Sequence, residues 1–264
     1  MPTSHYDAIA DLIEAFDRRA LRAFRQTSAE EKADGTAITT VDRETSDDLE
    51  AALRQRFPSY GIVSEEEPEP HAPQASRQWV IDPLDGTAMF ARGLPVWGLG
   101  IGLMLDAEPV EGYLSFPAIG ERYRCAGGEI VVNGKPHVQH PGDIVPQTRH
   151  ILVGSDLIHE LPLQRISGYK MRNFGTNLYP LIAAATGRAE AMISPRCFLW
   201  DIIPALPFCR ATGLEARFTN NEPFDVGAFW EPGRRRERMP APLVVGKPDV
   251  VEQIIDELSG QGHG

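Results

Sequence analysis

A nine-residue stretch at 79–87, WVIDPLDGT, constrains the fold more than any other part of this 264-residue chain. Its apolar start is typical of a buried strand, and Pro83 keeps the preceding Asp82 in an extended conformation. A second carboxylate, Asp85, follows three residues later, and Gly86 permits a sharp turn. The stretch therefore predicts a buried strand that ends in two closely spaced carboxylates.

These two aspartates favour a cation site over a simple turn. Gly86 also lets a ligand approach the backbone closely, and Thr87 begins a predicted helical turn whose N–H groups favour an anion. Two carboxylates beside an anion need a cation between them, and hard oxygen ligands suit Mg²⁺. Aspartates also occur in turns without any ligand, but the apolar strand that delivers this pair favours metal binding.

The charge balance limits the partners of the chain. The formal net charge is −11, which argues against a nucleic-acid surface, because such a surface needs a basic footprint. An acidic protein that binds phosphate needs local positive charge, and a bound cation is a compact way to supply it. With 42% hydrophobic residues, the chain can bury a sizeable core.

Targeting and redox features predict a cytoplasmic protein without a membrane partner. No apolar run approaches the length of a membrane span, and the first residues lack the basic-then-apolar pattern of a signal peptide. The odd cysteine count and the absence of a CxxC pair predict buried free thiols in a reducing compartment. The cysteines are Cys125, Cys197 and Cys209.

Hydrophobic periodicity predicts helices and strands along most of the chain. Two amphipathic helices are expected over 4–26 and 42–57, with Asp42 as the cap of the second. Further helical segments are predicted at 88–92, 179–186, 200–213 and 248–258. Strands are predicted at 61–64, 79–82, 95–105, 109–116, 121–126, 150–155, 189–194 and 241–246.

Turn residues at 133–149 predict a domain boundary near residue 140. The N-terminal part, 1–140, is expected to form an α+β domain that holds the aspartate pair. Beyond the boundary, strands and helices alternate, so 141–264 is expected to form a layered α/β domain.

Several segments together resemble one family. The stretch WVIDPLDGT resembles the metal-binding signature of the inositol monophosphatase family, which comprises Mg²⁺-dependent, lithium-sensitive phosphatases. Other segments follow in the family's order: TTVDRETSDDLEAAL at 39–53, GIVSEEE at 61–67, NGKP at 133–136, FGTNLYPLIAAATGRAEA at 174–191 and LWDIIPALPFCRATG at 199–213.

The resemblance implies a fold and an activity. The expected fold is the layered αβαβα sandwich of the inositol monophosphatase and fructose-1,6-bisphosphatase type. The expected activity is hydrolysis of a small phosphate monoester by a metal-activated water, in a protein that forms a homodimer. The phosphorylated metabolite itself stays open among inositol phosphates, sugar phosphates and related compounds.

The resemblance also implies roles for particular residues. Two or three Mg²⁺ ions would be held by Glu65, Asp82, the Leu84 carbonyl, Asp85 and Asp201. The catalytic residues would be Asp42, Glu65 and Thr87, with the Thr87 hydroxyl bonded to Asp42 and orienting the attacking water. The substrate would contact Asp85, Gly86, Thr87, Gly175, Thr176, Asn177, Ser194 and Asp201.

Simpler roles stay open for several of these residues. Asp42 and Asp201 also fit helix caps, and Gly175 also fits a turn glycine. Glu65 begins the acidic run 65–67, in which Glu66 and Glu67 are expected to form a solvated face.

Two departures from the family pattern affect the substrate pocket. Ser194 stands where inositol-specific members carry a glutamate, so recognition of an inositol ring is in doubt. Pro204 and Pro207 lie in a segment that is usually rich in alanine and glycine, and Pro207 is expected to kink the helix. These prolines keep a second hypothesis open, a regulatory or scaffolding protein with altered catalysis.

Two basic features complete the sequence-based expectations. Lys32 is expected near the metal ions, as in some members of the family. The loop 227–242 carries Arg234, Arg235, Arg236 and Arg238, which predict a solvated charge run. The alternative is a basic flap that touches a second anionic group on the substrate.

Overall fold

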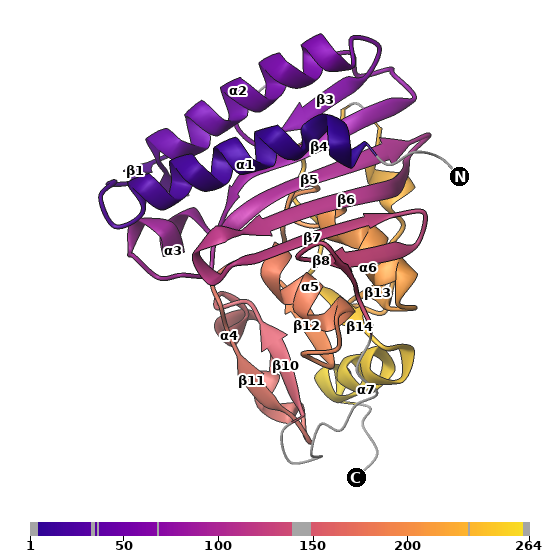
Figure 1. The fold of residues 1–264 in the computed structure, drawn as a ribbon. Helices are drawn as coiled ribbons and strands as arrows, with labels where there is room; N and C mark the ends of the chain where they lie inside the picture. The colour runs from indigo at the N-terminus through magenta and orange to yellow at the C-terminus, as the bar shows by residue number, and fades with distance from the viewer. Residues whose placement is uncertain are drawn as a thin grey trace.

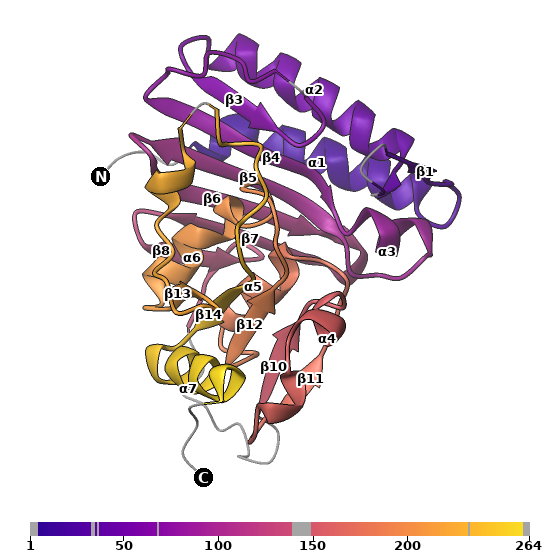
Figure 2. The same cartoon turned by 180° about the vertical axis from the view of Figure 1, so that it is seen from behind.

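The computed structural model describes residues 5–32, 35, 37–67, 69–138, 149–231 and 233–260. Five layers are stacked in the order helices, seven-stranded sheet, helices, five-stranded sheet and helix (Figure 1, Figure 2). The predicted αβαβα architecture is therefore confirmed. The predicted boundary near residue 140 lies outside the described residues, and the division into two domains stays a prediction.

The outer helix pair covers one face of the seven-stranded sheet (Figure 1). Helices α1 (Tyr6–Ala23) and α2 (Thr40–Arg56) match the two predicted amphipathic helices closely. Apolar side chains of α1, such as Ile9 and Phe16, pack in the same buried cluster as Trp79 of the sheet. This burial holds α1 against the sheet whose strand carries the aspartate pair.

The start of α2 corrects one prediction. Thr39, not Asp42, is the N-cap, and its hydroxyl accepts a hydrogen bond from the Val41 N–H at 3.2 Å. Asp42 reaches back from the first turn to accept the Thr39 N–H at 2.8 Å, which completes a capping box. Asp42 is thereby held rigidly, with its second oxygen left for another partner.

The seven-stranded sheet, called the large sheet here, has the order β3–β4–β5–β6–β7–β8–β9. Strands β3 and β4 are parallel, and every other neighbouring pair is antiparallel. The strands are β3 (Gly61–Ser64), β4 (Arg77–Asp85), β5 (Gly98–Leu105), β6 (Glu108–Phe116), β7 (Glu121–Ala126), β8 (Glu129–Val132) and β9 (Lys135–Pro136). A separate pair consists of β1 (Glu30–Glu31) and β2 (Ala37–Ile38).

The five-stranded sheet, called the small sheet, has the order β11–β10–β12–β14–β13. Strand β10 is parallel to β11 and β12, whereas β14 is antiparallel to β12 and β13. The strands are β10 (His150–Val153), β11 (Lys170–Arg172), β12 (Ala191–Ser194), β13 (Glu215–Phe218) and β14 (Leu243–Gly246). Helix α7 (Pro248–Ser259) covers its outer face.

The remaining helices are short. The α-helices are α3 (Thr87–Ala91), α4 (Leu157–Glu160), α5 (Leu178–Ala185) and α6 (Leu206–Ala211). The 3₁₀ helices are η1 (Pro117–Ile119), η3 (Leu163–Arg165), η4 (Ile203–Ala205) and η5 (Val226–Phe229). None of the described helices has both the length and the apolar character that crossing a membrane requires.

The middle layer consists of α5, α6 and η4. It packs closely on the large sheet because the sheet has glycines at the contact positions. A Cβ atom on Gly112 would lie 2.2 Å from the Pro204 carbonyl oxygen, and one on Gly100 would lie 2.3 Å from Leu178 Cδ1. Any side chain at these positions would push the layers apart. The close packing expected from small residues in the 199–213 segment is therefore supplied by glycines of β5 and β6.

The second proline of that segment also corrects a prediction. Pro207 is the second residue of α6 and does not kink a longer helix, because the predicted helix is divided into η4 and α6. Proline is tolerated in the first turn of a helix, where its missing N–H has no partner to lose. Pro204 likewise lies at the start of η4.

Candidate active site

The end of β4 is irregular between the two aspartates of the WVIDPLDGT stretch. Asp82 is paired with Gly100 and Asp85 with Gly98, and the register shifts between them. Pro83 has no N–H to donate, so the ladder is interrupted at this point. Both aspartates are buried, with 1% and 4% exposure. The predicted strand thus continues to Asp85 and holds both carboxylates on a rigid element.

Four carboxylates gather around this strand end. Glu65 follows β3, the parallel neighbour of β4, and its N–H bonds the Ile81 carbonyl at 3.1 Å. Asp201 approaches from the middle layer, just before η4. Burial raises the pKa of Glu65, Asp85 and Asp201 to about 7, and the negative charge of neighbouring carboxylates also raises it. Burial likewise raises the pKa of Asp82 well above 3.8.

Asp85 joins the large sheet to the middle layer. Its Oδ1 accepts the Asn177 N–H and its Oδ2 accepts the Leu178 N–H, both at 2.9 Å. These are N–H groups at the start of α5, where an anionic acceptor is favourable. Asp201 accepts the Phe198 N–H at 2.7 Å and does not cap a helix, since α6 begins at Leu206.

Glu65 is paired with a basic side chain from the N-terminal segment. Lys32 Nζ lies 2.8 Å from Glu65 Oε1 and 2.5 Å from Glu66 Oε1. The predicted position of Lys32 beside the site is therefore confirmed. The expectation that Glu66 belongs to a solvated face is wrong, because its side chain is 11% exposed and is paired with Lys32.

The Thr87 hydroxyl lies where the resemblance predicts it. Its Oγ1 is 2.7 Å from Asp42 Oδ1 and 2.9 Å from the Leu84 carbonyl oxygen. Burial raises the pKa of Asp42, while hydrogen bonds from Thr39 and Thr87 act in the opposite direction. One hydroxyl therefore connects the start of α2, the bulge of β4 and the start of α3.

The residues expected to contact the alcohol are not all in one place. Asn177 lines a hollow beside the carboxylates. Thr176 packs on Gly86, where an added Cβ would lie 2.5 Å from Thr176 Cγ2. Gly175 lies against Met89 of α3, at a positive φ of 73° that suits a turn glycine.

Ser194 lies behind the wall of this hollow. It is fully buried, and its hydroxyl can donate its single proton to Asn177 Oδ1 at 3.3 Å or to the Pro195 carbonyl at 3.2 Å. Its hydroxyl thus supports Asn177, and it does not take the place of a glutamate that reaches a ring hydroxyl.

The hollow has a volume of about 770 Å³. Glu65 and Asp201 line it, together with charged and aromatic groups that the sequence analysis did not assign to the site. These are Asp156, Glu160, Arg196, Phe198 and Trp200. Trp200 belongs to the 199–213 segment and Phe198 directly precedes it, whereas the neighbourhoods of Asp156, Glu160 and Arg196 carry no motif, so only the fold brings these three to the site.

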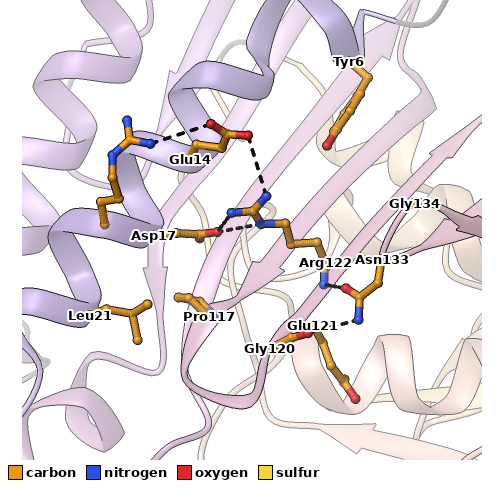
Figure 3. A pocket seen from close by; sticks show the side chains of 11 residues that line it. Tyr6, Glu14, Asp17, Leu21, Pro117, Gly120, Glu121, Arg122, Asn133 and Gly134 are labelled. Atoms are coloured by element: carbon orange, nitrogen blue, oxygen red, sulfur yellow. Dashed lines mark hydrogen bonds and ion pairs between the residues drawn. The ribbon is translucent and has the colours of Figure 1, made fainter.

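A second hollow, of about 700 Å³, lies between α1 and the large sheet (Figure 3). Its central Arg122 lies between Asp17 and Glu14 of α1, as Figure 3 shows. Asp17 also accepts the Ser115 hydroxyl at 2.6 Å. These charged side chains pair with one another and hold α1 against the sheet. We therefore assign them a structural role and assign no ligand to this hollow.

The carboxylate oxygens at the end of β4 suit a hard cation, although in their present orientation they do not enclose one. In the described ranges, no three His, Cys, Asp or Glu side chains form a group that could hold a metal ion as they stand. The oxygens of Asp85 are bonded to N–H groups, and Glu65 is bonded to Lys32. Carboxylate oxygens are nonetheless the ligands that Mg²⁺ takes, and buried carboxylates of one sign need a cation.

Comparison with known proteins identifies the family. The model of the inositol monophosphatase family matches residues 3–234, so the chain belongs to the inositol monophosphatase family. A histidinol-phosphatase of Chlorobaculum parvum is 30% identical over 209 residues, covering 76% of this chain and 77% of that protein. An inositol-1-monophosphatase of Mesorhizobium japonicum is 26% identical over 204 residues, covering 69% of this chain and 72% of that protein.

Solved structures agree on the fold. An IMPase of Thermotoga maritima superposes with a TM-score of 0.81 at 19% identity, covering 98% of this chain and 99% of that chain. The family match and the curated relatives make this chain a phosphoric monoester hydrolase, in a family that is typically Mg²⁺-dependent.

Proposed function

We propose that this protein hydrolyses a small phosphate monoester with Mg²⁺ held by Glu65, Asp82, Asp85, Asp201 and the Leu84 carbonyl. The observation that carries the proposal is the convergence of four carboxylates at the end of β4, where Asp82 and Asp85 are buried and Glu65 and Asp201 line the hollow. Since burial disfavours their charged forms, a bound cation is the natural partner for this group. Two or three Mg²⁺ ions per subunit are expected from the family.

Bound Mg²⁺ would lower the pKa of water and stabilise negative charge on the leaving oxygen. The protein's part is to orient the reacting groups. The Thr87 hydroxyl has a single proton, which its bond to Asp42 or to the Leu84 carbonyl uses. Its lone pairs then face away from these acceptors and can accept a hydrogen bond from the attacking water. Thr39 holds Asp42 in turn, through its N–H at 2.8 Å and its hydroxyl at 2.5 Å.

The turn after β4 is the proposed phosphate site. Gly86 has a φ of 84°, a conformation that glycine adopts without strain. The hydroxyl of Thr176, which touches Gly86, is buried without a hydrogen-bond partner in the part of the chain that the structure describes. A buried hydroxyl of this kind is costly unless a ligand satisfies it. We assign the backbone of Gly86 and Thr87, with Thr176, to the phosphate oxygens.

The alcohol part of the substrate is less constrained. The two curated relatives are named for histidinol phosphate and for inositol 1-phosphate. Ser194 is buried and bonded to Asn177, which does not favour recognition of an inositol ring at that position. The prolines that suggested altered catalysis lie in the first turns of η4 and α6, where proline is tolerated, so they do not favour a purely regulatory role. The expected homodimer stays a prediction, which light scattering can test.

Phosphate release with Mg²⁺ tests the proposal. The panel should contain sugar, inositol, nucleotide and amino-alcohol phosphates, each with and without EDTA. We expect turnover of at least one of them, abolished by EDTA and by Asp85→Asn. Glu67→Gln is a matched control in the same acidic segment and should retain activity. Turnover that survives both EDTA and Asp85→Asn would contradict the proposal.

A further inference from the structure

In the loop 227–242, Arg235 and Arg236 are held by hydrogen bonds and do not belong to the solvated charge run that the sequence suggested, whereas Arg238 is exposed. Arg235 is 3% exposed. Its guanidinium donates to the Trp230 carbonyl at 2.7 Å and to the Pro73 carbonyl and Gln78 Oε1 at 2.8 Å. These partners are neutral, and the guanidinium also lies 4.5 Å from the centre of the Trp230 ring, so Arg235 stabilises the loop against the large sheet by hydrogen bonds and a cation–π contact.

Arg236 fastens the same loop to the edge of the candidate active site. It donates to the carbonyls of Ser64 and Glu67 at 2.7 Å and of Glu65 at 2.8 Å. Its guanidinium also lies 4.8 Å from the centre of the Trp200 ring. One arginine thus binds the turn that carries Glu65 and packs on the residue before Asp201.

Arg238 is presented to the hollow by these two anchors. Its guanidinium lies 4.9 Å from the centre of the Phe198 ring and lines the hollow together with Asp201. Phe198 is itself fixed, since its ring stacks on Trp200 at 4.6 Å and its N–H bonds Asp201. Among the described residues, Arg238 has neither a hydrogen bond nor an ion pair with a carboxylate. The anchors therefore place an exposed positive charge at the wall of the site, near Asp201 but not paired with it; burial raises the pKa of that carboxyl, and this charge acts in the opposite direction.

We propose that Arg238 binds a second anionic group, a phosphate or a carboxylate, in the alcohol part of the substrate. The inference rests on the proposed phosphatase function and narrows its substrate class. A guanidinium stacked on an aromatic ring keeps its in-plane N–H donors free, and their fork matches the oxygens of a phosphate or carboxylate. Stacking also lowers the rotamer freedom lost on binding.

Asp156 and Glu160 also line the hollow. These carboxylates suggest a competing interpretation, in which the substrate carries an ammonium group. Glu160 is already 3.8 Å from Arg196, so part of its charge is balanced. Asp156 is exposed at the rim, where water screens its charge. Arg238 is exposed as well, but its guanidinium lies over the Phe198 ring, which stacks on Trp200, and no carboxylate among the described residues forms an ion pair with it. The observations therefore favour an anion, and histidinol phosphate, which carries an ammonium, is the contrasting substrate.

Paired substrates that differ by one anionic group test the proposal. We would compare 2-phosphoglycerate with glycerol 2-phosphate, and fructose 1,6-bisphosphate with fructose 1-phosphate. We expect kcat/KM to be higher for the more anionic member by about tenfold or more, the effect of a hydrogen bond between charged groups. Arg238→Gln should reduce this ratio about tenfold, mainly through KM, and Arg238→Lys should retain part of it.

Arg234 offers a matched control in the same loop. It donates to the Ala228 carbonyl at 2.8 Å and stacks on Phe229, away from the hollow. Arg234→Gln should leave the substrate ratio unchanged. A wild-type preference for histidinol phosphate over every anionic pair member would overturn the proposal. So would an equal loss on both pair members in Arg238→Gln, because that result assigns Arg238 to the reacting phosphate or to folding.

A binding measurement separates this inference from the proposed activity. Calorimetric titration with 2-phosphoglycerate and with glycerol 2-phosphate, with Ca²⁺ in place of Mg²⁺, needs no turnover. Tighter binding of 2-phosphoglycerate that is lost in Arg238→Gln supports the inference even if no substrate is hydrolysed. Equal binding of the two compounds to the wild type overturns it even if hydrolysis is observed.

Discussion

Gly112→Ala tests how closely the middle layer must approach the large sheet to place Asp201. The added Cβ would lie 2.2 Å from the Pro204 carbonyl oxygen and 2.8 Å from Phe208 Cε2. A backbone oxygen cannot move by a rotamer change, so η4 or β6 must shift. Overpacking of this kind costs typically about 1–3 kcal/mol, and we expect the upper end.

The expected loss converts into a measurable change in melting temperature. An unfolding entropy of about 2.1 cal/mol/K per residue gives about 0.55 kcal/mol/K for the 264 residues. A loss of about 3 kcal/mol therefore lowers Tm by about 5 °C in differential scanning calorimetry. Because η4 follows Asp201 directly, the affinity for Mg²⁺ should fall as well.

Two other glycines make the test specific. A Cβ added at Gly233 would meet open space, and its φ is not positive, so Gly233→Ala should leave Tm unchanged. At Gly100 the nearest atom is the flexible end of Leu178, so Gly100→Ala should cost less than Gly112→Ala. If Gly112→Ala melts within about 1 °C of the wild type, the account of the glycine-dependent packing is wrong.

Three further predictions concern the site and its supports. Thr87→Val should lower kcat by about 100-fold or more, while Thr87→Ser retains most activity, because the hydroxyl orients the attacking water; equal kcat values would refute that role. Burial raises the pKa of Glu111, but hydrogen bonds from His5 and Tyr113 outweigh it and hold the pKa below 4.5. The resulting stability is present above pH 4.5 and is lost as the pH falls through the folded-state pKa. Glu111→Gln should therefore destabilise the protein at pH 7, with a difference from the wild type in urea unfolding that narrows under acid; a constant difference would contradict this. Arg236→Met should lower the free energy of unfolding by about 2 kcal/mol, since the Ser64, Glu65 and Glu67 carbonyls lose their shared donor; an unchanged urea midpoint would argue against the anchor.

Local chemistry explains which parts of the site could be predicted from the sequence. The end of β4 was predictable, because Pro83 interrupts the ladder and Gly86 turns the chain whatever surrounds them. The N-cap of α2 was assigned wrongly, although the residues that decide it are close together in the sequence. Thr39 and Asp42 are three residues apart, which is the spacing of a capping box, but the periodic pattern alone pointed to Asp42 as the first residue.

The arginine loop could not be predicted, because its environment is set by distant parts of the chain. Arg235 and Arg236 bond groups that lie 157 to 172 positions away in the sequence, apart from the local bond to Trp230. A run of arginines normally indicates a solvated surface, and only the fold supplies the carbonyls that bury these two. The pairing of Lys32 with Glu66 could not be predicted either, because only the fold brings these two residues together.

The helix boundary in the segment 199–213 was predicted wrongly from the sequence. The sequence suggested one helix over 200–213, in which Pro207 would fall deep in the interior. The structure divides this segment into η4 and α6, and Pro204 of η4 packs against Gly102 and Gly112 of the large sheet. Contacts with such distant residues are not contained in the periodicity of the segment.

The central claim is that the four carboxylates at the end of β4 bind Mg²⁺, and isothermal titration calorimetry of the wild type, Asp85→Asn and Glu67→Gln tests it most directly. The account predicts saturable Mg²⁺ binding to the wild type and to the Glu67→Gln control, and loss of that binding in Asp85→Asn. If all three proteins bind Mg²⁺ alike, or if the folded wild type binds none, the assignment of the metal site is contradicted.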